Sequence, residues 1–325
     1  MKINLKKIFI INICLLVVVL ISLEAYAFYT YRIRCAPMVY RHAHMLKNNP
    51  DEYIKQNMPH YELPRKYDYK KIVSVLKTRF YLGSEKRAII TIGCSYTDGV
   101  GLNYNQTFAA KLNKYTRRLI YNRGLSASGP QFVYRQLSDE NFTNEIPDAE
   151  YVIYTFIYDH FKRVYRTMVQ MYSSDLSLRY DVKNGKLKER FRPFWFMYWS
   201  FLLKSCAEYD DKVTYDKEKE NNFPLFMKIM EESALQTKKN YPDSKFVLLE
   251  VPESGLCYDN YVPGTMELNR EEIKTLENMG IIYINAEELV GHKLRNPKYK
   301  VSDKEHPSEL FWEEVVPKLA KKLDL

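Results

Sequence analysis

The residues of this sequence that could do chemistry are a serine in the first third of the chain and an aspartate and a histidine close to its end. Ser95 stands in the run Gly93-Cys94-Ser95, directly after an apolar, β-branched stretch. Asp303 and His306 are three residues apart, and a proline follows the histidine. A serine hydroxyl attacks a carbonyl carbon when a base takes its proton and a third group fixes the tautomer of that base. Ser95, His306 and Asp303 therefore form a candidate catalytic triad.

Two other interpretations of the serine run stay open. Small residues in this pattern are also typical of a plain connection between a strand and a helix, with no chemistry at all. Cys94 is itself a second candidate nucleophile. At a strand end, however, Cys94 points away from Ser95, so we expect it to pack as a small apolar residue.

The elements that must position these residues follow from the pattern around them. Residues 89–92 predict a buried strand, and residues 107–115 predict a helix after it. Ser95 then lies at the carboxyl end of a parallel strand, where ligands bind in open α/β sheets. Pro307 fits the first turn of a last helix over residues 309–323, so the aspartate and the histidine are expected in a tight loop before that helix.

Strand-like and helix-like stretches alternate through most of the remaining chain. Further strands are predicted at residues 118–121, 151–158, 245–251 and 281–285, and further helices at 130–137 and 223–239. This alternation predicts a mainly parallel sheet that helices cover on both faces.

Residues 161–222 interrupt the alternation. They contain an aromatic run at 191–199 and a charged run at 210–220. We interpret them as an insertion, which either packs onto the domain or forms a ligand-stacking wall or a membrane contact.

The two ends of the candidate triad together resemble the SGNH (GDSL-like) hydrolases. The first sequence block of that family, Gly-Asp-Ser, matches Gly93-Cys94-Ser95, with a cysteine in place of the aspartate. This Gly-Cys-Ser variant resembles a bacterial branch of the family. The last block, Asp-x-x-His-Pro, matches Asp303 to Pro307.

Two further blocks of the family match less closely. Asn122 to Ala127 resembles Asn-x-Gly-x-x-Gly, in which the last glycine N–H binds the oxyanion, and alanine keeps that N–H. The third block, Gly-x-Asn-Asp, falls on Ile157 to His160, and Asp159 replaces the asparagine that donates to the oxyanion. An ionised carboxylate only accepts hydrogen bonds. Either His160 donates instead, or Asp159 is protonated, or the oxyanion hole is weaker. We expect Asp159 to hold His160, which presents an N–H to the oxyanion.

The resemblance covers roughly residues 85–325 and implies a flavodoxin-like three-layer α/β sandwich, the SGNH hydrolase fold. It implies a serine esterase that needs no cofactor and no metal, with the N–H groups of Ser95 and Ala127 at the oxyanion. The implied substrate is a glycan of the cell envelope or the diet that carries acetyl or other short acyl groups. Two alternatives stay open, because a fold does not settle a function: a glycan O-acyltransferase with the same triad, and a non-catalytic glycan-binding module.

The first 27 residues carry the pattern of an export signal. Lys2, Lys6 and Lys7 precede an apolar run, and Ala25-Tyr26-Ala27 has the form of a signal-peptidase site. Residues 8–27 are about long enough to cross a bilayer. We therefore expect either an uncleaved membrane anchor or a signal peptide cleaved after Ala27. In both cases the lysines stay inside and the rest of the chain is exported.

Length and charge set the wider frame. The chain of 325 residues is divided by these patterns into the export signal at 1–27, a juxtamembrane stalk and capping segment at 28–84, and the hydrolase-like domain at 85–325. The net charge is +9, but Lys and Arg are spread along the chain, so we expect no nucleic-acid partner. The five cysteines have no metal-like spacing, and the oligomeric state stays open.

Overall fold

The computed structural model describes residues 12–13, 15–26, 80–81, 85–125, 128–139, 142, 144, 146–164, 180–189, 218–252, 268–301 and 306–325. The chain divides into two compact units. One comprises Met1–Pro50 and Arg192–Lys217, and the other comprises Asp51–Phe191 and Glu218–Leu325.

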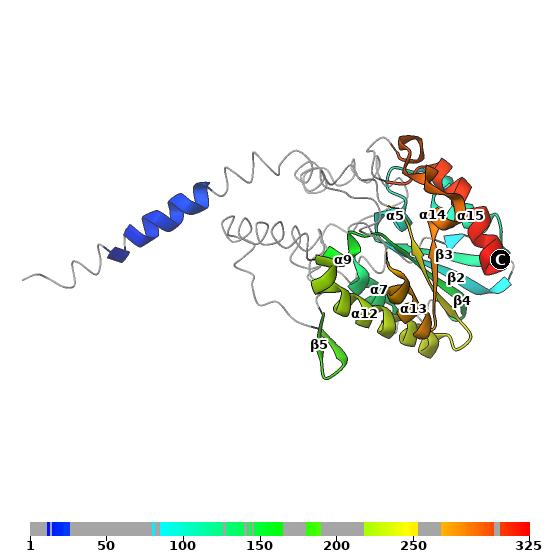
Figure 1. Ribbon diagram of the computed structural model, residues 1–325, viewed down its shortest axis with the longest axis horizontal. Helices are drawn as coiled ribbons and strands as arrows, with labels where there is room; N and C mark the ends of the chain where they lie inside the picture. The colour runs from blue at the N-terminus through cyan, green and yellow to red at the C-terminus, as the bar shows by residue number, and fades with distance from the viewer. Residues whose placement is uncertain are drawn as a thin grey trace, which may run out of the picture. The chain divides into compact units, whose positions relative to one another are not determined.

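In the described part of the second unit, six strands form one sheet in the order β1-β3-β2-β4-β7-β8 (Figure 1). The strands are β1 (Phe80–Tyr81), β2 (Glu85–Gly93), β3 (Arg118–Gly124), β4 (Ala149–Phe156), β7 (Lys245–Glu250) and β8 (Ile281–Asn285). β1 pairs antiparallel with β3, and the other neighbours are parallel. The parallel strands, numbered along the chain, have the order 2-1-3-4-5 of flavodoxin-like sheets. The expectation of a mainly parallel α/β fold is confirmed.

Helices connect these strands. The α-helices that position the site or cover the sheet are α5 (Ser95–Asp98), α6 (Phe108–Asn113), α7 (Pro130–Leu137), α9 (His160–Arg163), α12 (Glu218–Asn240), α13 (Arg270–Asn278), α14 (Ala286–Val290) and α15 (Glu309–Leu323). Short 3-10 helices are η2 (Tyr104–Gln106), η7 (His292–Arg295) and η8 (Pro297–Tyr299). A separate antiparallel hairpin consists of β5 (Tyr180–Lys183) and β6 (Lys186–Glu189).

Alternate residues of the central strands enter two apolar cores, one on each face of the sheet. Ile89 of β2 packs in the same core as Phe108 of α6 and Trp312 of α15. The next residue, Ile90, packs in the other core with Phe226 of α12. Because neighbouring strand residues point to opposite faces, both faces are buried, as a parallel sheet requires. Figure 1 shows α7 and α12 on one side of the sheet and α15 on the other.

The strand positions differ from expectation mainly at the sheet edge. Phe80 and Tyr81 of β1 lie opposite Tyr121 and Ile120 of β3, within the segment that we assigned to the stalk and cap. A strand of two residues is too short to show a period of two in the sequence. The sheet therefore recruits residues before position 85.

In the first unit, residues 15–26 are helical. Their apolar side chains are exposed, among them Leu16, Val18 and Ile21. Within the described ranges, no helix is both long enough and apolar enough to cross a membrane. The transmembrane helix expected over residues 8–27 stays a prediction, and part of that range lies outside the described residues. The aromatic run at 191–199 also lies outside them.

Candidate active site

Ser95 is the first residue of α5, and only Cys94 separates it from the end of β2. β2 has β3 on one side and β4 on the other, and the crossover connections diverge at this strand. This is the switch point at which ligands bind in open α/β sheets. The Ser95 side chain therefore lies where the sequence pattern predicted it, at the carboxyl end of a parallel strand.

His306 meets Ser95 at this strand end. His306 Nε2 lies 2.8 Å from Ser95 Oγ, although 211 residues separate them in the chain. This distance suits a base that takes the hydroxyl proton. The ring of Tyr96, the residue after the serine, contacts the imidazole edge-on, with 5.4 Å between the ring centroids. The imidazole is thus fixed from two directions.

Backbone hydrogen bonds anchor the segment that carries His306. The Val301 N–H donates to the His306 carbonyl oxygen at 2.9 Å, and the Ser308 N–H donates to the Tyr299 carbonyl oxygen at 2.8 Å. Residues 302–305, which include Asp303, lie outside the described residues. The role of Asp303 as the group that orients His306 stays a prediction.

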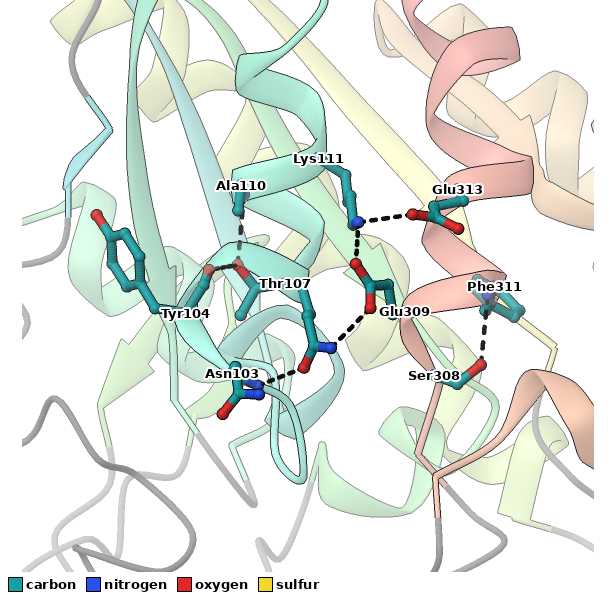
Figure 2. A network of polar contacts seen from close by, with 10 residues as sticks. Asn103, Tyr104, Thr107, Ala110, Lys111, Ser308, Glu309, Phe311 and Glu313 are labelled. Atoms are coloured by element: carbon teal, nitrogen blue, oxygen red, sulfur yellow. Dashed lines mark hydrogen bonds and ion pairs between the residues drawn. The ribbon is translucent and has the colours of Figure 1, made fainter.

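A partly buried network joins the start of α15 to α6 (Figure 2). Lys111 is only 4% exposed, and its ammonium pairs with Glu309 and, at 2.8 Å, with Glu313. Gln106 also donates to Glu309, at 2.6 Å. Burial acts to lower the pKa of Lys111, but its hydrogen bonds to the two glutamates outweigh burial and raise that pKa. The network fixes the first turn of α15, three residues beyond His306.

Two glycines let the strand ends approach the serine turn closely. Gly93, the last residue of β2, has a φ of +155°, and a Cβ there would overlap the hydroxyls of Thr97 and Thr155. Gly124, the last residue of β3, lies against the backbone of Asp98, which a Cβ would overlap. A larger residue at either position would displace the turn at the end of β2.

Cys94 is buried in an apolar core. Burial raises the pKa of its thiol, so the thiol is held in its un-ionised form, which is a poor nucleophile. The structure thus supports the expectation that Cys94 packs as a small apolar residue. The other four cysteines lie outside the described residues.

Leu125 and Ser128, which flank the expected oxyanion donor Ala127 in the sequence, both bind Gly93. Ser126 and Ala127 lie outside the described residues. The Leu125 N–H and the Ser128 hydroxyl both donate to the carbonyl oxygen of Gly93, at 2.8 and 3.0 Å. The oxyanion role of the Ala127 N–H stays a prediction.

Asp159 and His160 follow β4, but they do not bind each other as we expected. Asp159 Oδ2 accepts a hydrogen bond from Arg163 Nε at 2.5 Å and forms an ion pair with Nη2 at the same distance. His160 Nδ1 lies 2.6 Å from the Tyr154 hydroxyl, and the two rings stack. The physical reason is spacing: Arg163 is one helical turn beyond Asp159 and reaches its carboxylate.

The His160 ring is fully buried. Its Nε2 has no hydrogen-bond partner in the described part of the chain. Burial lowers the pKa of His160 well below its ordinary value, and the charge of Arg163 lowers it further, so the ring is neutral. A ring without exposed surface needs a rearrangement before it can touch a substrate. Its role at the oxyanion is untested.

Two residues near the site were not identified from the sequence. Tyr96 contacts the candidate base, and Arg163 binds Asp159. The sequence held a signal for each: an aromatic residue directly after the serine, and an arginine four residues after an aspartate. Among the described residues, no cluster of His, Cys, Asp or Glu could hold a metal ion.

Comparisons with known proteins find only distant structural likenesses. No protein-family model and no curated protein matches the sequence. Among solved structures, an acetylxylan esterase from Geobacillus stearothermophilus is 12% identical, with a TM-score of 0.43 over 75% of this chain and 96% of that one. A lipase from a goat rumen metagenome is 12% identical, with a TM-score of 0.42 over 72% and 96%. A family two carbohydrate esterase from Clostridium thermocellum is 12% identical, with a TM-score of 0.40 over 73% and 65%. At TM-scores below 0.5, these likenesses are too distant to assign a family or a reaction.

Proposed function

We propose that this chain is a serine esterase of the SGNH hydrolase type, which removes acetyl or other short acyl groups from a glycan. The observation that carries the proposal is the 2.8 Å contact between Ser95 Oγ and His306 Nε2. A hydroxyl and an imidazole paired at the switch point of a parallel sheet have the geometry of a nucleophile and its base. The resemblance of the Ser95 and His306 segments to two family blocks supports the same conclusion.

In the proposed reaction, Ser95 Oγ attacks the ester carbonyl carbon while His306 Nε2 accepts the hydroxyl proton. The N–H groups of Ser95 and Ala127 bind the oxyanion, and Asp303 orients the imidazole. When the tetrahedral intermediate collapses, the carbon–oxygen bond to the alcohol breaks and His306 returns its proton to that alcohol. Water, deprotonated by His306, then attacks the acyl-enzyme carbonyl carbon. The bond from that carbon to Ser95 Oγ breaks, His306 returns its proton to Ser95 Oγ, and the carboxylic acid is released.

The proposal also includes the location of the substrate. An exported chain, with residues 8–27 in the membrane or removed, meets acylated glycans outside the cytoplasm. The exposed apolar side chains on the helix at 15–26 support an apolar environment for that segment.

The first prediction tests the nucleophile. Ser95→Ala should abolish hydrolysis of short-chain aryl esters, because it removes the hydroxyl that lies 2.8 Å from His306 Nε2. Cys94→Ala is the matched control at the neighbouring position and should retain turnover within a few-fold. The melting temperature of Ser95→Ala should stay within a few degrees of the wild-type value.

A phosphonate probe gives the direct measurement, because it modifies only an activated serine. The labelled peptide of the wild-type protein should contain Ser95, and Ser95→Ala should take up no label. Loss of activity in Cys94→Ala with unchanged turnover in Ser95→Ala would overturn the assignment. Products from acetylated xylan decide between hydrolysis and transfer: free acetate is expected, and acetyl appearing on an added sugar acceptor would indicate a transferase.

A further inference from the structure

We propose that Arg163, held by Asp159, is a positioning residue that fixes residues 128–131, which follow the expected oxyanion donor Ala127 in the sequence, against the nucleophile turn. The inference rests on the proposed function, since it assigns a task within that site. It also gives Asp159 a role that does not require its carboxylate to face the oxyanion.

The first step is the fixed guanidinium. Asp159 precedes α9 and Arg163 ends it, and the two side chains are 14% and 9% exposed. Nε of the arginine donates to Asp159 Oδ2 at 2.5 Å, and Nη2 is ion-paired with the same oxygen at 2.5 Å. Hydrogen bonds between charged groups in a largely buried site are short and strong, and a planar guanidinium with two of its donors engaged has little freedom to turn. The direction in which its third nitrogen, Nη1, points is therefore fixed.

The second step is the contact that Nη1 makes. It donates to the carbonyl oxygen of Ser128 at 3.0 Å. The same stretch is tied back to Arg163 again, because Gln131 Nε2 donates to the Arg163 carbonyl oxygen at 2.7 Å. Gly129 lies so close to Arg163 that a Cβ on the glycine would come within 2.7 Å of the Arg163 Cβ. The end of α9 and residues 128–131 are thus in tight contact.

The third step leads to the nucleophile. Ser128 Oγ donates to the Gly93 carbonyl oxygen at 3.0 Å, and Leu125 N–H donates to the same oxygen at 2.8 Å. Gly93 is two residues before Ser95. The positively charged Arg163 also acts on Cys94, where it opposes the rise of the thiol pKa that burial causes. A continuous set of hydrogen bonds therefore runs from Asp159 to the residue that leads into the nucleophile turn.

The segment between these anchors carries Ala127, whose N–H is the proposed second oxyanion donor. Donors that stabilise a developing charge must be held in place before the reaction, because their value lies in not having to reorganise. In the resembling family an asparagine at the position of Asp159 donates directly. Here the carboxylate is engaged by Arg163, and the pair acts on the oxyanion through the segment it holds.

The test compares two buried arginine–carboxylate pairs in one domain. Arg163→Gln removes the guanidinium while keeping a polar side chain. We expect kcat to fall by roughly 100-fold and KM to stay within about three-fold, because the lost positioning matters in the transition state. Arg118→Gln is the matched control. Its pair with Glu150 is also 2.5 Å long, with side chains 17% and 20% exposed, but it lies at the amino-terminal ends of β3 and β4. It should change kcat by less than three-fold.

A second readout does not depend on catalysis. Hydrogen exchange of the amides at 125–131 should become at least ten-fold faster in Arg163→Gln and stay unchanged in Arg118→Gln. Arg163→Lys keeps the charge without the fork, and it should recover part of the kcat. Unchanged exchange and unchanged kcat in Arg163→Gln would overturn the inference, as would equal losses in both glutamine variants. If the wild-type protein hydrolyses no ester and takes up no phosphonate, the proposed function fails, while the exchange measurement still decides whether Arg163 holds the segment.

Discussion

The hydrogen bond between Ser95 and His306 is too weak to bring its own partners together. A neutral hydrogen bond contributes a net stability of about 1 kcal/mol. Closing a flexible loop of 211 residues costs on the order of 5 kcal/mol, because the penalty grows with the logarithm of loop length. The pair therefore exists because β2 and α15 are fixed in the fold, and the side chains meet as a consequence.

His160 is the residue at which stability and catalysis can be separated. In the structure its Nδ1 is hydrogen-bonded to the Tyr154 hydroxyl, so His160→Phe should leave that buried hydroxyl without this partner. The free energy of unfolding should fall by about 1–3 kcal/mol. We predict a lower melting temperature and a kcat within three-fold of wild type.

A double-mutant cycle with Tyr154→Phe supplies the control. If the two side chains are mutual partners, the double variant should lose less stability than the sum of the single variants. The opposite result, a kcat lowered by about 100-fold with unchanged melting temperature, would instead place His160 at the oxyanion.

At this scale, spacing identified Ser95 and His306, since a serine after a strand and a histidine before a helix each carry a local signal. The partner of Asp159 was missed because a sequence does not show which of two acceptable neighbours reaches a carboxylate. Both His160 and Arg163 could have done so. Side-chain packing decides between them: the imidazole turns inward to the Tyr154 hydroxyl, and the guanidinium, itself only 9% exposed, reaches the carboxylate from one helical turn away.

Among the elements, α15 links stability to the site. Its first turn follows the His306 segment directly, and Lys111 of α6 clamps it through two glutamates (Figure 2). Its inner face also places Trp312 in the core. The position of the base thus depends on a contact between two helices that are far apart in sequence.

Lys111→Met tests this clamp, because methionine keeps the apolar stem and removes the charge. The hydrogen bond from Lys111 lowers the pKa of Glu309, against the opposing effect of burial. A carboxyl whose folded pKa is lowered stabilises the protein above its ordinary pKa, and that stability is lost as pH falls through the lowered value. We therefore predict a lower melting temperature than wild type at pH 7, and a difference that shrinks below about pH 4.

Lys293→Met is the control, because Lys293 of η7 pairs with a glutamate of the same helix, α15. Lys293 pairs with Glu314 at 2.8 Å, but its side chain is 46% exposed, and exposed pairs contribute little. Its melting temperature should follow the wild-type value across the pH range. A Lys111→Met protein with wild-type stability at pH 7 would show that the network does not hold α15.

Elements with a clear hydrophobic pattern in the sequence were predictable, and the shortest elements were not. β8 and α15 begin and end where the sequence indicated. The hairpin of β5 and β6 was not predicted, although Asn184 and Gly185 both have positive φ, as a two-residue Asn-Gly turn requires. Its strands have only four residues each and lie inside the segment that we had interpreted as an insertion.

For the whole molecule, alternation of strands and helices was enough to predict a parallel sheet, because only that architecture buries such strands on both faces. Strand order was not predictable in the same way. It depends on which side of β2 each crossover takes, and that choice is made by packing between residues far apart in the sequence. The position of Ser95 at the switch point became visible only with the order known.

The expected location of the protein in the cell gives a prediction at this scale. Because three lysines precede the apolar run and the helix at 15–26 exposes apolar side chains, the full chain should fractionate with membranes. Added protease should digest the catalytic domain from outside intact cells. A Val18→Lys, Ile21→Lys double variant should leave the membrane fraction, with Lys2→Gln as the conservative control. Intact protein in the soluble cytoplasmic fraction would contradict the prediction.

The separation of Ser95 and His306 along the chain also sets a delay between the synthesis of the two residues. A ribosome that adds about 5–20 residues per second needs about 10–40 s to make the 211 residues between them. During that time the serine turn has been synthesised, but its base has not. Under the proposed function, we expect a nascent chain to be inert toward esters while it is being made, with activity beginning only when the strand made early meets the helix made late.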